Sequence, residues 1–203
     1  MSYPGKRALD VCVAATVLVA AAPALGVAAL LIRLESHGHP IYRQRRVGRA
    51  GEPFELYKLR TMVSGAETMG AGLALAAGDS RITRFGAVLR RTSIDELPNL
   101  VNVLRGEMSI VGPRPTVQVQ VDRYTPRQRG RLSVPPGLTG WAQIQGRASL
   151  PWSERIELDL WYVEHASLAL DLRILWRTVR MVVSGHGLYK GETGGWSDPP
   201  RSS

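Results

Sequence analysis

An uncharged, apolar stretch near the start of the chain constrains the fold more than any other feature. Twenty-two consecutive residues, from Val11 to Ile32, carry no charged side chain. A straight helix of that length extends roughly 33 Å, about the thickness of the hydrocarbon core of a bilayer. Pro23 lies in the middle of the stretch, with Gly26 one turn later. Because a proline inside a helix removes a hydrogen bond and kinks the axis, the stretch predicts a bent membrane segment.

Basic residues on both sides of this stretch indicate how it enters the membrane. Lys6 and Arg7 precede it, and five arginines follow it, namely Arg33, Arg43, Arg45, Arg46 and Arg49. Since basic flanks stay on the cytoplasmic side, both ends are expected there. We predict a re-entrant helix-break-helix hairpin over residues 1–36, bent at Ala22 and Pro23. A cleaved signal peptide and a buried core helix are the alternatives.

The rest of the chain predicts one domain of helices and short strands. Strands are expected within residues 41–57, around a turn at Gly48–Gly51. Amphipathic helices are expected over Ser153–Val163 and Asp171–Gly185, and their apolar and arginine-bearing faces suit either a membrane interface or a protein core. The predicted fold class is therefore α/β: a mostly helical, membrane-associated single domain with a small β element, a re-entrant hairpin and interfacial helices.

The domain boundaries follow from composition. Residues 37–188 are expected to form a domain on the cytosolic face of the membrane, and this domain contains the candidate catalytic groups described below. The Gly- and Ala-rich segment Ser64–Ser80 is a candidate for a mobile lid or a poorly ordered loop. Residues 189–203, rich in Gly, Pro and Ser, are predicted to be a disordered tail.

Composition also narrows the classes of function. A single cysteine, Cys12, excludes a disulfide framework and a cysteine-based zinc site, and the four histidines lack the spacing of metal ligands. Between Arg33 and Arg131 lie 17 basic and 9 acidic residues, so almost all of the net charge of +9 is there. Such a field attracts phosphorylated ligands, nucleic acid or an anionic membrane. Because aromatic residues are few (6%), a stacking platform for nucleic acid is disfavoured.

Two adjacent carboxylates, Asp95 and Glu96, are the candidate catalytic groups. Ser93 and Glu96 have the spacing of a capping box, which predicts a helix beginning at Ser93 and gives both acids a purely structural alternative role. In the functional interpretation one carboxylate acts as a nucleophile and the other as a base or metal ligand. Arg90 precedes the pair and Arg114, held between two prolines, follows it. Carboxylates among arginines, with a divalent cation, predict a diphosphate site.

Four motifs occur in an order that is characteristic of one family. They are Lys58-Leu59-Arg60-Thr61-Met62, Ser93-Ile94-Asp95-Glu96-Leu97, Gly112-Pro113-Arg114-Pro115 and Pro136-Gly137-Leu138-Thr139-Gly140-Trp141-Ala142-Gln143. With the apolar hairpin before them, they resemble the bacterial sugar transferase family, the monotopic polyprenyl-phosphate phosphoglycosyl transferases, in its minimal catalytic form. The resemblance extends from about Lys6 to Gly185.

This resemblance implies an activity and a set of partners. Members transfer a sugar 1-phosphate from a UDP-sugar to undecaprenyl phosphate and release UMP, at the cytoplasmic face of the bacterial inner membrane and anchored in one leaflet. The expected partners are therefore the UDP-sugar, the polyprenyl phosphate and membrane lipid, with no nucleic acid. Neither the sugar nor the oligomeric state follows from the sequence. A basic membrane-surface binding protein without catalysis is the alternative.

The resemblance also implies roles for single residues. Asp95 is expected to attack the β-phosphorus and form a covalent phosphosugar intermediate, so that the kinetics are ping-pong, and to contact the Mg²⁺ cofactor. Glu96 is expected to transfer a proton or to shape the carboxylate pair. The expected substrate- and phosphate-binding residues are Lys58, Arg90, Arg114 and Asp159. The Pro136–Gln143 motif is expected either to shape the nucleotide pocket or to form only a turn and a strand.

Overall fold

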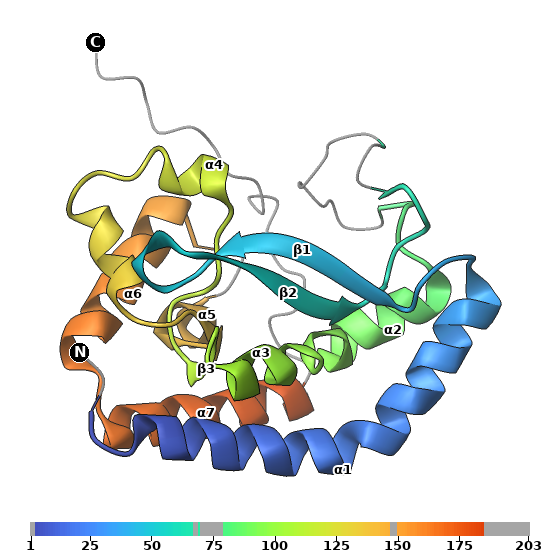
Figure 1. Cartoon of the computed structure of the whole chain (residues 1–203), viewed down its shortest axis with the longest axis horizontal. Helices are drawn as coiled ribbons and strands as arrows, with labels where there is room; N and C mark the ends of the chain where they lie inside the picture. Colours follow the sequence, from blue (N-terminus) through green and yellow to red (C-terminus); the bar gives the residue numbers. More distant parts are fainter. Residues whose placement is uncertain (1–2, 67–68, 70–78, 147–149, 185–203) are drawn as a thin grey trace.

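Helices predominate in the protein, and two small sheets lie among them (Figure 1). The computed structural model describes residues 3–66, 69, 79–146 and 150–184. The helices are α1 (Lys6–Glu35), α2 (Arg84–Thr92), α3 (Asn99–Arg105), α4 (Gln118–Val121), α5 (Trp141–Gln145), α6 (Trp152–His165) and α7 (Leu168–Ser184). The strands are β1 (Ile41–Val47), β2 (Pro53–Leu59), β3 (Ser109–Val111) and β4 (Gly137–Thr139). The predicted lid or loop at Ser64–Ser80 lies largely outside the described residues, and the predicted tail at 189–203 lies entirely outside them.

The apolar stretch forms one long helix instead of two. α1 runs through Pro23 without a break, so the prediction of two helices separated at Ala22 and Pro23 is wrong. The helix changes direction partway along its length (Figure 1), as helices that contain proline commonly do. Because the alanines on both sides of Pro23 favour helix strongly, the backbone accommodates the lost hydrogen bond by bending.

Most of α1 is exposed, and this exposure is inconsistent with a buried core helix. It is the one helix in the described part of the chain that is long and apolar enough to cross a membrane. Only 11% of its most apolar segment is buried against the rest of the protein. Val19, Leu30 and Leu34 are among its exposed side chains.

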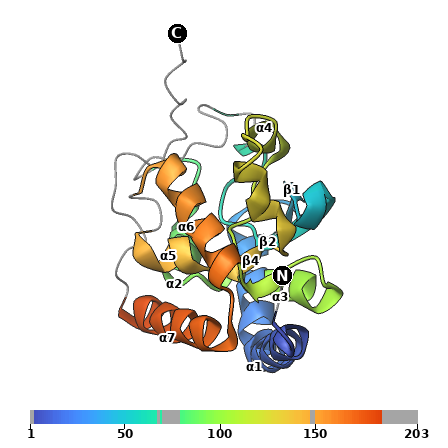
Figure 2. The ribbon, with the colours of Figure 1, turned by 90° about the vertical axis from the view of Figure 1, so that its left-hand side faces the viewer.

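Helix α7 lies beside α1 along one side of the molecule (Figures 1 and 2). Leu170 and Ile174 point into the core, whereas Leu172, Trp176 and Val179 are exposed. The predicted amphipathic helices at Ser153–Val163 and Asp171–Gly185 are therefore present as α6 and α7. Exposed apolar side chains therefore occur on both α1 and α7.

The predicted pair of strands is confirmed as the antiparallel hairpin β1–β2. Its register runs from Ile41 opposite Leu59 to Val47 opposite Pro53. A short 3₁₀ helix, η1 (Arg49–Gly51), closes the turn at the predicted position. The β2 side chains Phe54 and Leu56 belong to the main core cluster, which also contains residues of α3, α6 and α7.

The second sheet explains two of the sequence motifs. β3 and β4 pair in parallel, with Ser109 opposite Gly137. A Cβ atom at Gly112 would lie 2.6 Å from the carbonyl oxygen of Pro135, and one at Gly137 would lie 2.1 Å from the nitrogen of Gly112. Only glycine permits this close approach of two backbones. The Pro136–Gln143 motif is therefore a strand and the short helix α5, and it holds the Gly112–Pro115 turn in place.

The segment around the two carboxylates differs from the prediction of a helix beginning at Ser93. Helix α2 already occupies residues 84–92, and Ser93 ends it in a left-handed conformation with φ 57°. A helix-starting cap requires an extended backbone at the capping residue, and the Ser93 side chain makes no capping hydrogen bond. A 3₁₀ turn, η3 (Ile94–Glu96), follows, and α3 begins at Asn99. Gly106 ends α3 with φ 86°, at the predicted stop.

Candidate active site

The two adjacent carboxylates lie in the η3 turn, between α2 and α3. Because the turn is a single tight loop of 3₁₀ helix, its consecutive side chains leave it in different directions. Asp95 is buried, with 8% of its surface exposed, whereas the side chain of Glu96 is 23% exposed. The two acids therefore face different surroundings.

Glu96 is held by two cations from distant parts of the chain. Its Oε1 lies 2.7 Å from Nζ of Lys58 on β2 and 3.0 Å from a guanidinium nitrogen of Arg114, which follows β3. Burial alone would raise the pKa of Glu96, but the attraction of Lys58 and Arg114 outweighs burial. The net effect is a pKa well below the usual range of a glutamate, so Glu96 stays ionised.

The carboxylate of Asp95 is in a different state. In the part of the chain that the structure describes, it makes no hydrogen bond and no ion pair. Burial raises its pKa to about 6, and the negative charge of Glu96 acts in the same direction. Lys58, Arg90 and Arg114 oppose this rise through their positive charges. Asp95 is thus a desolvated carboxylate that faces cations without being bonded to one.

The two predicted arginines come from the segments before and after the two carboxylates. Arg90 lies in the last turn of α2 and donates from Nε to the hydroxyl of Thr61, at 2.7 Å. The side chain of Arg114 remains 54% exposed although it contacts Glu96. An arginine that is partly exposed and electrostatically anchored can bind phosphate oxygens with its remaining N–H groups. The structure therefore brings Lys58, Arg90 and Arg114 together around Asp95.

Asp159 is close to this group but does not belong to its surface. It lies on α6, is 2% exposed and forms an ion pair with Arg131, which is also buried. Arg131 in turn donates to the backbone carbonyl of Arg114 at 3.0 Å and to the hydroxyl of Tyr124 at 2.5 Å. Burial raises the pKa of Asp159 to about 6, although Arg131 opposes this effect. Asp159 thus stabilises the turn that carries Arg114 indirectly, through its ion pair with Arg131.

Sequence reasoning missed Arg131 and Tyr124, and it gave no role to Thr61, although Thr61 lies in the Lys58–Met62 motif. Arg131 is one of 23 arginines and lies in no motif, so nothing in the local pattern distinguished it. Its burial within the 3₁₀ helix η4 (Gln128–Ser133) was the informative property, since arginine is almost never fully buried without a partner. Burial of that kind depends on packing against α6.

The donor set fits a hard cation such as Mg²⁺ only in part. Within the described residues, no three His, Cys, Asp or Glu side chains gather into a metal site. Mg²⁺ usually keeps several waters and binds through one or two carboxylates together with substrate phosphates. The unpartnered carboxylate of Asp95 can serve as such a ligand. The fit therefore requires the phosphates of a substrate.

Comparison with known proteins agrees with this chemistry. The model of the bacterial sugar transferase family matches residues 1–185. A UDP-glucose:undecaprenyl-phosphate glucose-1-phosphate transferase of Caulobacter vibrioides is 45% identical over 91% of this chain and 72% of its own length. An uncharacterized sugar transferase of Bacillus subtilis is 41% identical over 90% of this chain and 89% of its own. A UDP-N-acetylgalactosamine-undecaprenyl-phosphate N-acetylgalactosaminephosphotransferase of Aeromonas hydrophila is 40% identical over 90% of this chain, but the match spans only 44% of that longer protein.

Proposed function

The chain belongs to the bacterial sugar transferase family, and from this premise we propose that it moves a sugar 1-phosphate from a UDP-sugar to undecaprenyl phosphate through a phosphorylated Asp95. The protein is a transferase, and the names of its relatives identify a UDP-sugar donor and an undecaprenyl-phosphate acceptor. The alternative of a basic binding protein without catalysis is therefore not supported.

The state of the Asp95 carboxylate is the observation that carries the covalent mechanism. In the first step a carboxylate oxygen attacks the phosphorus that bears the sugar. The bond from this phosphorus to the bridging oxygen breaks, and UMP leaves with the electron pair. In the second step a phosphate oxygen of the lipid attacks the same phosphorus, and the carboxylate of Asp95 is released. A buried carboxylate without a bonded partner suits this role, because little solvation must be lost before it attacks.

Glu96 has a different role in this proposal. Because Lys58 and Arg114 keep its pKa low, it is a poor acceptor for a proton. Of the two roles expected for Glu96, we therefore favour shaping the site over proton transfer. It holds Lys58 and Arg114 where their free N–H groups can bind the donor diphosphate.

Mg²⁺ is the cofactor that we propose for this site. Asp95 would hold the ion together with phosphate oxygens of the donor, and the ion would neutralise the charge of the diphosphate. Lys58, Arg90 and Arg114 act on the same oxygens from the protein side. Fixed cations that face a developing negative charge stabilise a transition state without reorganising.

The proposed location is the cytoplasmic face of the membrane, in one leaflet. The exposed apolar side chains of α1 and α7 support membrane contact, and the bend in α1 supports a path that returns to the side of entry. Lys6 and Arg33 lie at the two ends of the apolar part of the helix, and basic flanks favour the same, cytoplasmic side. A site next to this surface can reach both a soluble nucleotide sugar and the phosphate of a lipid.

Release of UMP in the absence of the lipid acceptor tests the covalent step. Purified protein in detergent with Mg²⁺ and a panel of UDP-sugars should release about one UMP per enzyme from its preferred donor. Intact-mass measurement should then show an added sugar phosphate, and peptide mapping should place it on Asp95. Asp95→Asn should abolish both signals, whereas Asp122→Asn, at an exposed carboxylate directly after α4, should retain them.

Two outcomes would contradict the mechanism. An adduct on another residue would remove Asp95 from its role. Double-reciprocal plots that intersect, instead of running parallel, would indicate direct transfer between two bound substrates. Failure of every UDP-sugar to release UMP, even with undecaprenyl phosphate present, would contradict the proposed reaction as a whole.

A further inference from the structure

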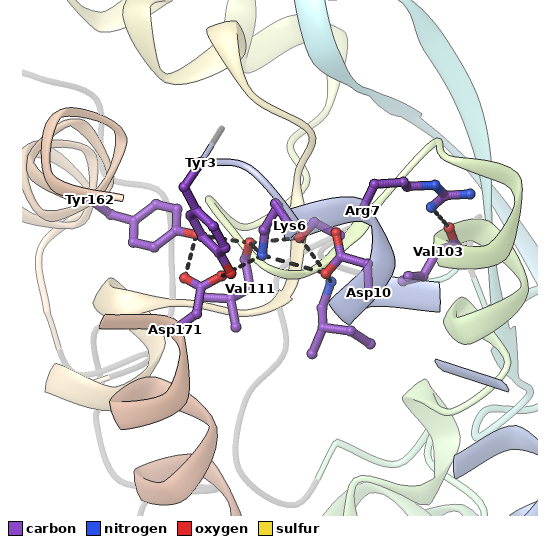
Figure 3. Close-up of polar contacts among 10 residues, drawn as sticks. Tyr3, Lys6, Arg7, Asp10, Val103, Val111, Tyr162 and Asp171 are labelled. Carbon is purple, nitrogen blue, oxygen red and sulfur yellow. Dashed lines mark hydrogen bonds and ion pairs between the residues drawn. The ribbon is translucent and has the colours of Figure 1, made fainter. Parts of the chain in front are cut away.

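A buried polar network fixes the start of α1 to the catalytic domain (Figure 3). Its centre is Asp171 of α7, which is completely buried. The Asp171 carboxylate accepts hydrogen bonds from Nζ of Lys6 at 2.6 Å, from the hydroxyl of Tyr3 at 2.8 Å and from the hydroxyl of Tyr162 at 2.8 Å. The first turn of α1 is thereby joined to both α6 and α7.

The same network extends onto strand β3. The carbonyl oxygen of Val111 accepts hydrogen bonds from Lys6 and from the hydroxyl of Tyr162, each at 3.1 Å. One turn further along α1, the carboxylate of Asp10 accepts from the backbone N–H of Ile110 at 2.9 Å. Two side chains of α1 therefore bond to backbone groups of two successive residues of β3.

Strand β3 leads directly into the turn that carries Arg114. Val111 is followed by Gly112, whose N–H bonds to the carbonyl of Thr139 on β4 at 2.9 Å. Arg114 then contacts Glu96. A displacement of β3 relative to β4 would therefore move the guanidinium of Arg114 away from the carboxylates.

The buried charges permit only one position of α1 along β3. Sliding the helix by one turn would move Lys6 by about 5.4 Å and leave the buried carboxylate of Asp171 without its cation, whereas Asp10, on the same helix, would move together with Lys6. Removing one partner from a buried ion pair is strongly unfavourable. Arg7, the next residue, donates instead to the carbonyl oxygens of Val103 and Leu104, near the end of α3, so it holds α1 without touching β3.

We propose that Lys6 is a positioning residue: through Asp171, Tyr162 and the Val111 carbonyl, it holds β3 so that Arg114 meets Glu96 and the donor diphosphate. The membrane helix and the phosphate-binding turn are thus one mechanical unit. This inference rests on the proposed function, since it assigns Arg114 a role in binding the donor.

A comparison of Lys6→Met with Arg7→Met tests the inference. Both variants lose one positive charge from the same turn and the same membrane flank, but only Lys6→Met releases β3. We expect Lys6→Met to raise the KM for the UDP-sugar and to lower kcat/KM about tenfold. Arg7→Met should remain within about twofold of the unaltered protein, and Lys6→Arg should recover most of the loss. Vesicle flotation and thermal unfolding should be recorded for all variants.

A double-mutant cycle with Arg114→Lys separates positioning from a general loss of structure. If Lys6 acts through Arg114, the double variant should be about as impaired as Arg114→Lys alone. Multiplicative losses would overturn the inference, as would a Lys6→Met variant that loses kcat with an unchanged KM, because a smaller folded fraction gives that result. Equal impairment by Arg7→Met would also overturn it.

Tyr162→Phe offers a milder change if Lys6→Met does not fold. It removes only the hydroxyl that joins Asp171 to the Val111 carbonyl, and it should raise the same KM. An unchanged KM in folded Tyr162→Phe would overturn the inference. If the unaltered protein releases no UMP from any donor, the proposed function fails. If the unaltered protein releases UMP and these variants behave as it does, only the positioning role fails.

Discussion

Asp95 and Glu96 are neighbours in the chain, but the fold places them in opposite electrostatic settings. Glu96 has two bonded cations and a lowered pKa, whereas burial raises the pKa of Asp95. Pairs of acids whose pKa values are driven apart commonly divide catalytic roles between them. The division here makes Glu96 an anchor for cations and Asp95 the group that reacts.

The rate of UMP release should depend on the ionisation of Asp95. Only the carboxylate form is nucleophilic, and its pKa lies near about 6. We expect kcat/KM for the UDP-sugar to be level above pH 7 and to fall up to tenfold per pH unit below about 6. Asp159 titrates in the same range, so Asp159→Asn is the control, and it should keep the acidic limb. A profile that is flat from pH 5 to 7 would contradict this assignment.

The same burial predicts that Asp95 destabilises the protein at neutral pH. The pKa is about 6 in the fold and about 3.9 in an unfolded chain. The folded state therefore holds this proton more tightly. The stabilisation from this proton is complete below pH 4 and is lost as the pH rises through about 6.

Asp95→Asn should therefore raise the unfolding free energy at pH 7.5, by on the order of 2–3 kcal/mol given 1.36 kcal/mol per pKa unit. Thermal unfolding in detergent should show an increase of several degrees in Tm. The gain should shrink as the pH falls through about 6 and should disappear below about pH 4, where Asp95 becomes protonated in both states. A lower Tm at pH 7.5 would mean that the charged carboxylate is stabilised by contacts that the amide lacks.

Glu96→Gln should affect the site in two ways. Loss of the anionic anchor leaves Lys58 and Arg114 without their partner. A hydrogen bond to a charged group contributes about 1.5–3 kcal/mol. We therefore expect kcat/KM to fall on the order of 10- to 100-fold. Loss of the negative charge also lowers the pKa of Asp95, since Glu96 raises it. The acidic limb of the pH profile should therefore move to lower pH. A shift to higher pH would contradict this electrostatic account.

At the scale of elements, α1 combines a membrane segment with two attachments to the domain. Its first turn is joined to β3 and α7, and Arg60 holds the two residues that directly follow its last turn. The guanidinium of Arg60 donates to the carbonyls of Ser36 and His37 at 2.7 and 2.8 Å. Because both ends are held by the same domain, both are expected on one side of the membrane, and the bend reconciles that requirement with an apolar helix of 30 residues.

Pro23, the proline inside the bent helix α1, should therefore control topology. Pro23→Ala restores a backbone donor and a good helix former, and it should increase the fraction of molecules whose helix spans the bilayer. The measurement is the labelling of single cysteines at positions 2 and 37 by an impermeant thiol reagent, in cells and in a Cys12→Ser background. We expect both positions to be cytoplasmic in the parent protein. Pro4→Ala, which lies before the helix, should leave the labelling unchanged, and opposite labelling of the two parent sites would contradict the re-entrant path.

For the molecule as a whole, exposed apolar side chains and a net positive charge both favour binding to a membrane. Helices α1 and α7 lie along one side of the molecule and both carry exposed apolar side chains, and the formal net charge is +9. Apolar burial in a membrane is insensitive to salt, whereas the attraction of exposed charges to anionic lipid is screened over about 10 Å at 0.1 M. The two contributions can therefore be separated by ionic strength.

Binding to vesicles should be weakened by salt but not abolished. We expect the affinity for phosphatidylglycerol-containing vesicles, measured by flotation, to decrease severalfold between about 0.05 and 0.5 M NaCl and then to level off. Over this range the Debye length shortens from more than about 10 Å to less than about 8 Å. Trp176→Glu, on the exposed face of α7, should lower the level that remains. Complete release at high salt would show that attachment is purely electrostatic.

The sequence alone predicted the long apolar segment, the hairpin β1–β2, the helices α6 and α7 and the family resemblance. It also singled out Lys58, Arg90, Asp95, Glu96 and Arg114 as candidates for the site. These features follow from local periodicity, composition and motif order. The break at Ala22–Pro23 and the helix start at Ser93 were wrong for a common reason. Each pattern permits two local structures. Pro23 permits a bend or a break in the helix, and Ser93 permits the start or the end of a helix; the neighbouring helical residues decide between them.

Only the tertiary structure decided which carboxylate is free and which is bonded. Glu96 meets Lys58 and Arg114 across 38 and 18 residues of sequence, and Asp171 meets Lys6 across 165. Arg131 acquires its importance by burial against Asp159. Charge pairing and desolvation depend on which surfaces pack together, and no periodicity along the chain records that packing.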